Sequence, residues 1–260
     1  MSAGTFTPRP AAAPVSRMIA AQTALETRML LRNGEQLLLT VIIPALLLVL
    51  FSSVDIVSVP LDAAAGEKSV DFLAPGVLAL AVMSTAFTGQ AIATGFDRRY
   101  GVLKRLGASP LPRWALMAAK TLSVLVTEVL QIALLTVIAL GLGWSPQGNP
   151  LSVALLLLLG TAAFSGLGLL MAGTLKAEVT LAAANLVFLL LLVGGGVIVP
   201  LEKFPGAVRD VLGLLPISAL SDGLREVLRH GAALPWGDAA VLGAWAVLGL
   251  GAAAKLFRWE

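Results

Sequence analysis

The sequence predicts an all-α integral membrane protein with six transmembrane helices and with both termini on the cytoplasmic side. Its 260 residues are 58% hydrophobic and only 13% charged, and the mean hydropathy is +0.92. Soluble domains carry about 25% charged residues, so most of this chain must face lipid or other apolar helices. Six apolar segments are each close to the ~20 residues that cross a bilayer. Lysine and arginine recur in alternate connections, which places the termini inside.

The N-terminal region divides into a tail and a helix. Residues 1–16 are rich in Pro, Ala, Ser and Thr, which predicts a disordered cytoplasmic tail followed by one transmembrane domain over residues 17–260. Residues 15–36 alternate apolar and charged side chains at roughly helical spacing, as in an amphipathic helix at the membrane interface. An ordinary helical extension of the tail is the alternative.

The expected spans follow in order, and they cover residues 37–54, 72–96, 114–142, 151–175, 179–199 and 236–257. Pro44 predicts a kink in the first span, because proline removes a helical hydrogen bond. The glycines of the last three spans are typical of close helix contacts in membranes; they include Gly160, Gly166, Gly168 and Gly173, Gly194 to Gly196, and Gly243, Gly249 and Gly251.

The connection after the second span is a short charged island between two apolar runs. Asp97 is placed to cap a helix that Gly107, Pro110 and Pro112 end. Its apolar side chains lie on one face and its cations occupy the rest of the surface: Val102, Leu103 and Leu106 against Arg98, Arg99, Lys104 and Arg105. We predict a cytoplasmic helix of about two or three turns. The alternative is a basic loop that only follows the positive-inside rule.

Residues 200–235 do not resemble a simple loop. Apolar side chains recur at helical spacing on both sides of Pro216, which predicts two short amphipathic helices joined there. Neither is long enough to span the bilayer, so we expect a partly re-entrant helical hairpin on the outer side, between spans five and six.

A few polar residues lie within the expected spans. Thr121, Glu128 and Gln131 lie close to one face of the third span, and Asn185 lies in the fifth. Ionisable groups at membrane depth are costly and face the bundle interior, a partner or water. They indicate either a translocation path or subunit interface, or hydrogen bonds that help helices to pack.

Two stretches resemble signatures of the ABC-2 type transporter permeases, in particular the daunorubicin-resistance permeases. The first is Asp97-Arg98-Arg99-Tyr100-Gly101-Val102-Leu103-Lys104-Arg105-Leu106, which is similar to the coupling helix of that family. Asp97 stands where the family more often has Glu, and Val102 where it often has Thr. The second is the outer segment, similar in Pro200, Glu202 and Pro205, and again in Pro216, Asp222 and Arg225.

The resemblance implies the membrane subunit of an ATP-driven exporter in a bacterial inner membrane, moving a drug-like or lipid-like amphiphile outward. Residues 15–36 would form an elbow helix, and Val102, Leu103 and Leu106 would enter a groove of a separate ABC-type ATPase subunit. The cations of the segment would steer docking or contact lipid headgroups. A second permease subunit would complete the assembly among membrane lipids, with no nucleic-acid partner.

Chemistry on this chain itself is not expected. It lacks the Gly-x-x-x-x-Gly-Lys-Ser/Thr phosphate loop, so ATP and Mg would lie on the partner subunit. It has no cysteine, and His230 is its sole histidine, without metal-ligand spacing around it. No cofactor, metal or catalytic residue is therefore assigned. The alternatives are a lipid-linked polysaccharide exporter, a membrane anchor that recruits a soluble partner without transport, and a lipid-modifying enzyme, for which we find no cluster of acids, His or Ser.

Overall fold

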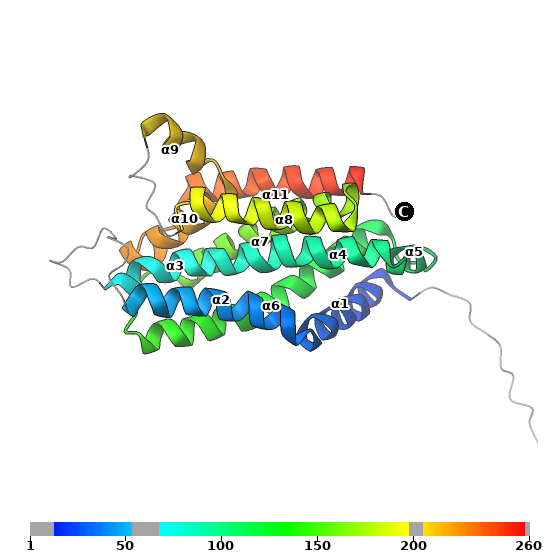
Figure 1. The fold of residues 1–260 in the computed structure, drawn as a ribbon, viewed down its shortest axis with the longest axis horizontal. Helices are drawn as coiled ribbons and strands as arrows, with labels where there is room; N and C mark the ends of the chain where they lie inside the picture. The colour runs from blue at the N-terminus through cyan, green and yellow to red at the C-terminus, as the bar shows by residue number, and fades with distance from the viewer. Residues whose placement is uncertain (1–12, 54–67, 198–204, 258–260) are drawn as a thin grey trace, which may run out of the picture.

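The protein folds into an elongated bundle of helices (Figure 1). The computed structural model describes residues 13–53, 68–197 and 205–257, without the side chains of residues 35–39 and 113. Within these ranges the regular elements are all helical. They are α1 (Val15–Arg32), α2 (Gly34–Ser53), α3 (Ser69–Val82), η2 (Met83–Gly89), α4 (Gln90–Arg99), α5 (Val102–Gly107), α6 (Arg113–Gly141), α7 (Pro150–Thr174), α8 (Ala177–Gly194), α9 (Gly206–Gly213), α10 (Pro216–His230) and α11 (Trp236–Leu256).

Five described helices are long and apolar enough to cross a membrane. They are Ser69–Arg99, Trp114–Gly141, Pro150–Thr174, Ala177–Gly194 and Trp236–Leu256, and they coincide with five expected spans. The helix expected as the first span exists as α2, with Pro44 inside it, but its described apolar part is only Thr40–Ser52. A multi-pass membrane protein is confirmed, whereas the sixth crossing and the orientation stay predictions.

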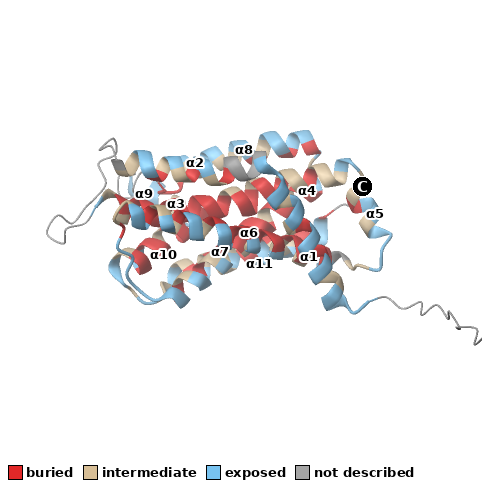
Figure 2. Ribbon diagram, turned by 90° about the horizontal axis from the view of Figure 1, so that it is seen from below, coloured by how far each residue is buried: buried red, intermediate tan, exposed pale blue. Residues whose placement is uncertain are grey.

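The centre of the bundle is the continuous helix formed by α3, η2 and α4. Its side chains are buried along most of its length (Figure 2). The η2 segment is a π-helical turn, a feature that leaves carbonyl groups displaced from the regular ladder. Gly168 of α7 packs against this turn, since a Cβ added there would lie 2.9 Å from the carbonyl oxygen of Phe87. Only glycine lets α7 approach the π turn this closely.

Helices α7 and α11 are also joined through glycines. A Cβ on Gly166 would lie 2.7 Å from the carbonyl carbon of Gly249, and one on Gly249 would lie 3.1 Å from the backbone nitrogen of Leu167. The prediction of close glycine contacts is confirmed for these residues. It is wrong for Gly243 and Gly251, because an added Cβ at either would meet nothing within 4 Å among the described residues.

The two ends of the bundle carry different short helices. α5 and the C-terminal end of α11 lie at one end, and α9 and α10 lie at the other, as both ribbon views show (Figures 1 and 2). The prediction of two short helices around Pro216 is confirmed, with Pro205 preceding α9 and Pro216 opening α10. α10 is buried on most of its surface, whereas α9 has no buried residue and projects from the bundle. Pro200 and Glu202 lie outside the described residues.

Candidate functional site

The predicted coupling helix is α5, and it begins later than the sequence pattern indicates. The helix of the second span continues through Asp97, Arg98 and Arg99, so all three belong to the last turn of α4. Gly101, in the left-handed conformation with φ 71°, is the residue that precedes α5, which has only six residues. The expected N-cap role of Asp97 is therefore wrong, because its carboxylate pairs with Lys120 instead.

Leu103 anchors α5 to its own bundle. Its side chain is 0% exposed and packs with Leu116 of α6, Leu169 of α7, and Ala253 and Phe257 at the end of α11. The expectation that Leu103 enters a groove of a partner is wrong for this structure. An amphipathic helix presents the same pattern whichever protein covers its apolar face.

The remaining residues of the segment differ in exposure. Lys104 and Arg105 are exposed on α5, while Gly101, Val102 and Leu106 are half-buried. Leu106 contacts the edge of the cluster around Leu103. The surface that α5 offers to a partner is therefore basic, with half-buried aliphatic side chains beside it.

A buried cation joins three helices next to α5. Lys120 of α6 is 4% exposed. Its Nζ lies 2.8 Å from Oδ2 of Asp97 in α4 and 3.0 Å from Oε1 of Glu26 in α1. Gln22 of α1 donates a hydrogen bond of 2.9 Å to the same Glu26 oxygen. We call Glu26, Asp97 and Lys120 the Lys120 triad. The sequence pattern did not predict this triad, although a lysine inside an expected span was a signal that an acidic partner lies nearby.

The two arginines after Asp97 hold the other side of α4. Arg98 donates a 2.5 Å hydrogen bond to the carbonyl of Leu175, just after α7. Arg99 forms an exposed ion pair with Glu178 at the start of α8. Both were expected to steer docking or contact headgroups, and both contact their own chain. The last turn of α4 is thus tied to α1, α6, α7 and α8.

The polar residues of α6 face different neighbours. Glu128 accepts a 2.5 Å hydrogen bond from the hydroxyl of Thr161 in α7, and its other oxygen has no partner among the described residues. Gln131 accepts a hydrogen bond of 2.8 Å from Thr85 of η2 and donates one of 2.5 Å to the carbonyl of Thr40 in α2.

The other two candidate residues of the path lie elsewhere. Thr121 is half-buried near the α5 end of α6, and Asn185 is exposed on α8, where its amide donates to the carbonyl of Leu181. The structure does not gather Thr121, Glu128, Gln131 and Asn185 into one site.

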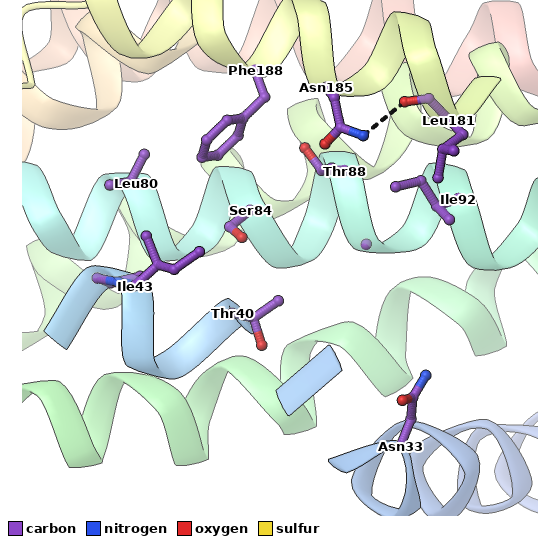
Figure 3. A pocket seen from close by; sticks show the side chains of 12 residues that line it. Asn33, Thr40, Ile43, Leu80, Ser84, Thr88, Ile92, Leu181, Asn185 and Phe188 are labelled. Atoms are coloured by element: carbon purple, nitrogen blue, oxygen red, sulfur yellow. Dashed lines mark hydrogen bonds between the residues drawn. The ribbon is translucent and has the colours of Figure 1, made fainter. Parts of the chain in front are cut away.

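A groove of about 550 Å³ lies between α2, the central helix and α8. Asn185 and Phe188 of α8 point toward Ser84 and Thr88 of η2, with Ile43 of α2 across from them (Figure 3). Its described lining is apolar with hydroxyl and amide groups and contains no charged side chain: Asn33, Thr40, Ile43, Pro44, Leu80, Ser84, Thr88, Gly89, Ile92, Leu181, Asn185 and Phe188. Gln131 is not among the described lining residues of this groove, but it donates a hydrogen bond to the carbonyl of Thr40, which is.

The described outer residues meet at Arg225. Its guanidinium donates to Asp222 at 3.0 Å and to the carbonyl of Val197 at 2.8 Å, and it lies 4.1 Å from the ring centroid of Phe72. A Cβ on Gly76 would lie 2.8 Å from the backbone carbonyl oxygen of Val197, as well as 2.8 Å from the guanidinium, so α3 needs glycine there. Arg225, paired with Asp222 within α10, thus holds α10 against the start of α3.

These features define a multi-pass, all-helical membrane subunit with a short basic helix at one end and an apolar groove along its side. The chain belongs to the ABC-2 type transporter family, whose model matches residues 19–228. It is 26% identical over 235 residues to the Bacillus subtilis (strain 168) protein named "Putative transport permease YvfS", covering 87% of this chain and 91% of that protein. The family indicated by the two sequence signatures is confirmed, and the chain is a membrane subunit of an ABC transporter.

Proposed function

We propose that this subunit forms the pathway of an ATP-driven exporter that moves a drug-like or lipid-like amphiphile outward across a bacterial inner membrane. The groove between α2, η2–α4 and α8 is the observation that carries this proposal. Its volume falls in the ~300–1,000 Å³ range of small-molecule sites. An apolar lining with a few hydroxyl and amide groups suits a molecule that is largely apolar and partly polar.

The energy for transport comes, in this proposal, from a separate ABC-type ATPase subunit that binds ATP and Mg. α5 docks on that subunit, and the exposed Lys104 and Arg105 attract an acidic surface on it. A force applied to α5 is transmitted to the bundle through Leu103 and through the last turn of α4. A second permease subunit, identical or related, closes the groove from the side.

The groove favours an amphiphile over a lipid-linked polysaccharide. The phosphate groups of such a glycan carrier are anionic, and anions in a membrane pathway need cations or helix N-termini as partners. The described lining offers hydroxyl and amide groups instead. A membrane anchor that does not transport would not need the groove. Measurement of substrate flux across the membrane therefore separates these alternatives.

Asn185→Trp is expected to block transport, since the indole would fill the groove beside Thr88 and Phe188. The assay is ATP-dependent uptake of daunorubicin, a fluorescent amphiphile, into inverted vesicles that contain the complete complex. We expect a several-fold loss of uptake. The matched control is Val137→Trp, which places the same side chain at an exposed site of α6 outside the groove lining.

Two outcomes contradict the proposal. Absence of daunorubicin uptake by the unsubstituted complex would overturn a drug-like substrate. Equal uptake by Asn185→Trp and by Val137→Trp would overturn the groove as the pathway.

A further inference from the structure

The Lys120 triad links α1 to the helix that leads into α5. Asp97 lies four residues before Gly101, and Glu26 lies in the fourth turn of α1. Both carboxylates contact the one ammonium group, at 2.8 Å from Asp97 and 3.0 Å from Glu26. In the sequence, Lys120 is 94 residues from Glu26 and 23 residues from Asp97. Nothing in the coupling scheme proposed above requires this link.

The packing of α1 shows why the link matters. Its buried residues are Gln22 and Glu26, whereas Leu25 and Met29 are 51% and 47% exposed. α1 therefore packs on α6 by a mixed face, on which Gln22 and Glu26 are buried and Met18, Ile19 and Leu30 are half-buried, while Leu25 and Met29 are exposed. Thr23 adds a 3.5 Å contact to the carbonyl of Ala119 on the same face. Polar contacts thus help to position α1, and the ion pair between Glu26 and the Lys120 ammonium is the buried charged contact among them.

Removal of that charge has a defined consequence. Two carboxylates would remain close together in a poorly hydrated space, and breaking a buried ion pair by removing one partner is strongly destabilising. α1 and α4 would then repel one another at this point. Removal of all three charges leaves no such repulsion, but it also removes the ion pairs that connect α1 to α4.

We propose that Lys120 is a positioning residue that makes α1 follow the last turn of α4, so that α1 and α5 move as one body when α5 is displaced. The displacement by an ATPase subunit rests on the proposed function. The tie between α1 and α5 is a property of this chain alone. An amphipathic helix with exposed apolar side chains would thereby move with α5 in each transport cycle.

The test measures the distance between α1 and α5. The chain has no cysteine, so Ala24→Cys in α1 and Ala108→Cys at the end of α5, both exposed, would be its sole thiols. Spin labels on this pair are measured by pulsed electron paramagnetic resonance in the complete complex in lipid nanodiscs, before and after trapping with ATP, Mg and vanadate. We expect one narrow distance distribution that is unchanged by trapping.

Three variants decide the role of Lys120. Lys120→Met is expected to broaden the distribution several-fold, and Lys120→Arg is expected to keep it narrow because the charge remains. The triple variant Glu26→Gln, Asp97→Asn, Lys120→Met removes the tie without leaving buried charges, and we expect a broad distribution again. Lys255→Met, which removes an exposed cation at the same end of the bundle, is the control and keeps it narrow.

The proposal is overturned if Lys120→Met or the triple variant gives a distribution as narrow as the unsubstituted pair. It is also overturned if trapping changes the distance between α1 and α5. Where no ATPase subunit accompanies the chain, the proposed function fails, yet the comparison of variants without nucleotide still tests the tie.

Discussion

Leu103→Asp is expected to abolish ATP-dependent transport while the chain still inserts into the membrane. The side chain is fully enclosed by apolar residues of α6, α7 and α11, and a carboxylate cannot be buried there without a partner. α5 would therefore detach from the end of the bundle. A force applied to α5 would then no longer be transmitted to α7 and α11. The measurement is daunorubicin uptake by inverted vesicles, with the amount of inserted protein determined in the same preparation.

The matched variant is Leu103→Met, which conserves volume and costs less than about 1.5 kcal/mol in typical cores. We expect it to retain most of the uptake. Normal uptake by Leu103→Asp would contradict the role of this contact, and loss of insertion would show that Leu103 acts in folding rather than in coupling.

Gly166→Leu is expected to eliminate the folded protein. At this residue α7 lies against the backbone of α11, and an added Cβ alone would lie 2.5 Å from the nitrogen of Leu250. Backbone atoms on both sides cannot yield as a flexible side chain can, so the two helices must separate. Membrane helices associate through such close packing of small residues. The yield of monodisperse protein on size-exclusion chromatography reports the loss.

Gly243→Leu is the control, because it makes the same change in α11 at a residue where an added Cβ meets nothing within 4 Å. We expect a yield close to that of the unsubstituted protein. Equal yields from Gly166→Leu and Gly243→Leu would contradict the close approach of α7 and α11.

Long apolar runs predicted the helices well, for a physical reason. In lipid each backbone polar group must be satisfied within its own segment, so a run of sufficient length can only be helical. The expected segment 151–175 is α7, and Pro216 separates two short helices as predicted. Periodicity on both sides of a proline is local information, and local information sufficed for these elements.

The sequence could not predict which surface covers each face. The pattern of α1 shows an apolar and a polar face, but lipid and protein interior are both apolar, so either face can meet the bundle. Leu103 raises the same ambiguity, since its apolar face could have met a partner subunit. Glu128 and Gln131 are three residues apart on α6, yet they contact α7 in one case and η2 with α2 in the other.

The Lys120 triad could not be predicted from local sequence patterns. Its members come from three separate helices, and each has a reasonable local role: Asp97 as a helix cap, Glu26 on the polar face of an interfacial helix, and Lys120 near the cytoplasmic margin of a span. Their pairing is decided by the relative placement of α1, α4 and α6, which no local pattern specifies.

The most direct test of the central claim is recovery of the chain with its partners from its native membrane in mild detergent, followed by measurement of ATP hydrolysis. We expect an ABC-type ATPase subunit to be recovered with the chain. We expect it to be lost when Lys104→Glu and Arg105→Glu reverse the exposed charge of α5, and retained in the control Lys255→Glu. Recovery of the chain alone without ATP hydrolysis, or retention of the ATPase by the charge-reversed α5, would contradict the account.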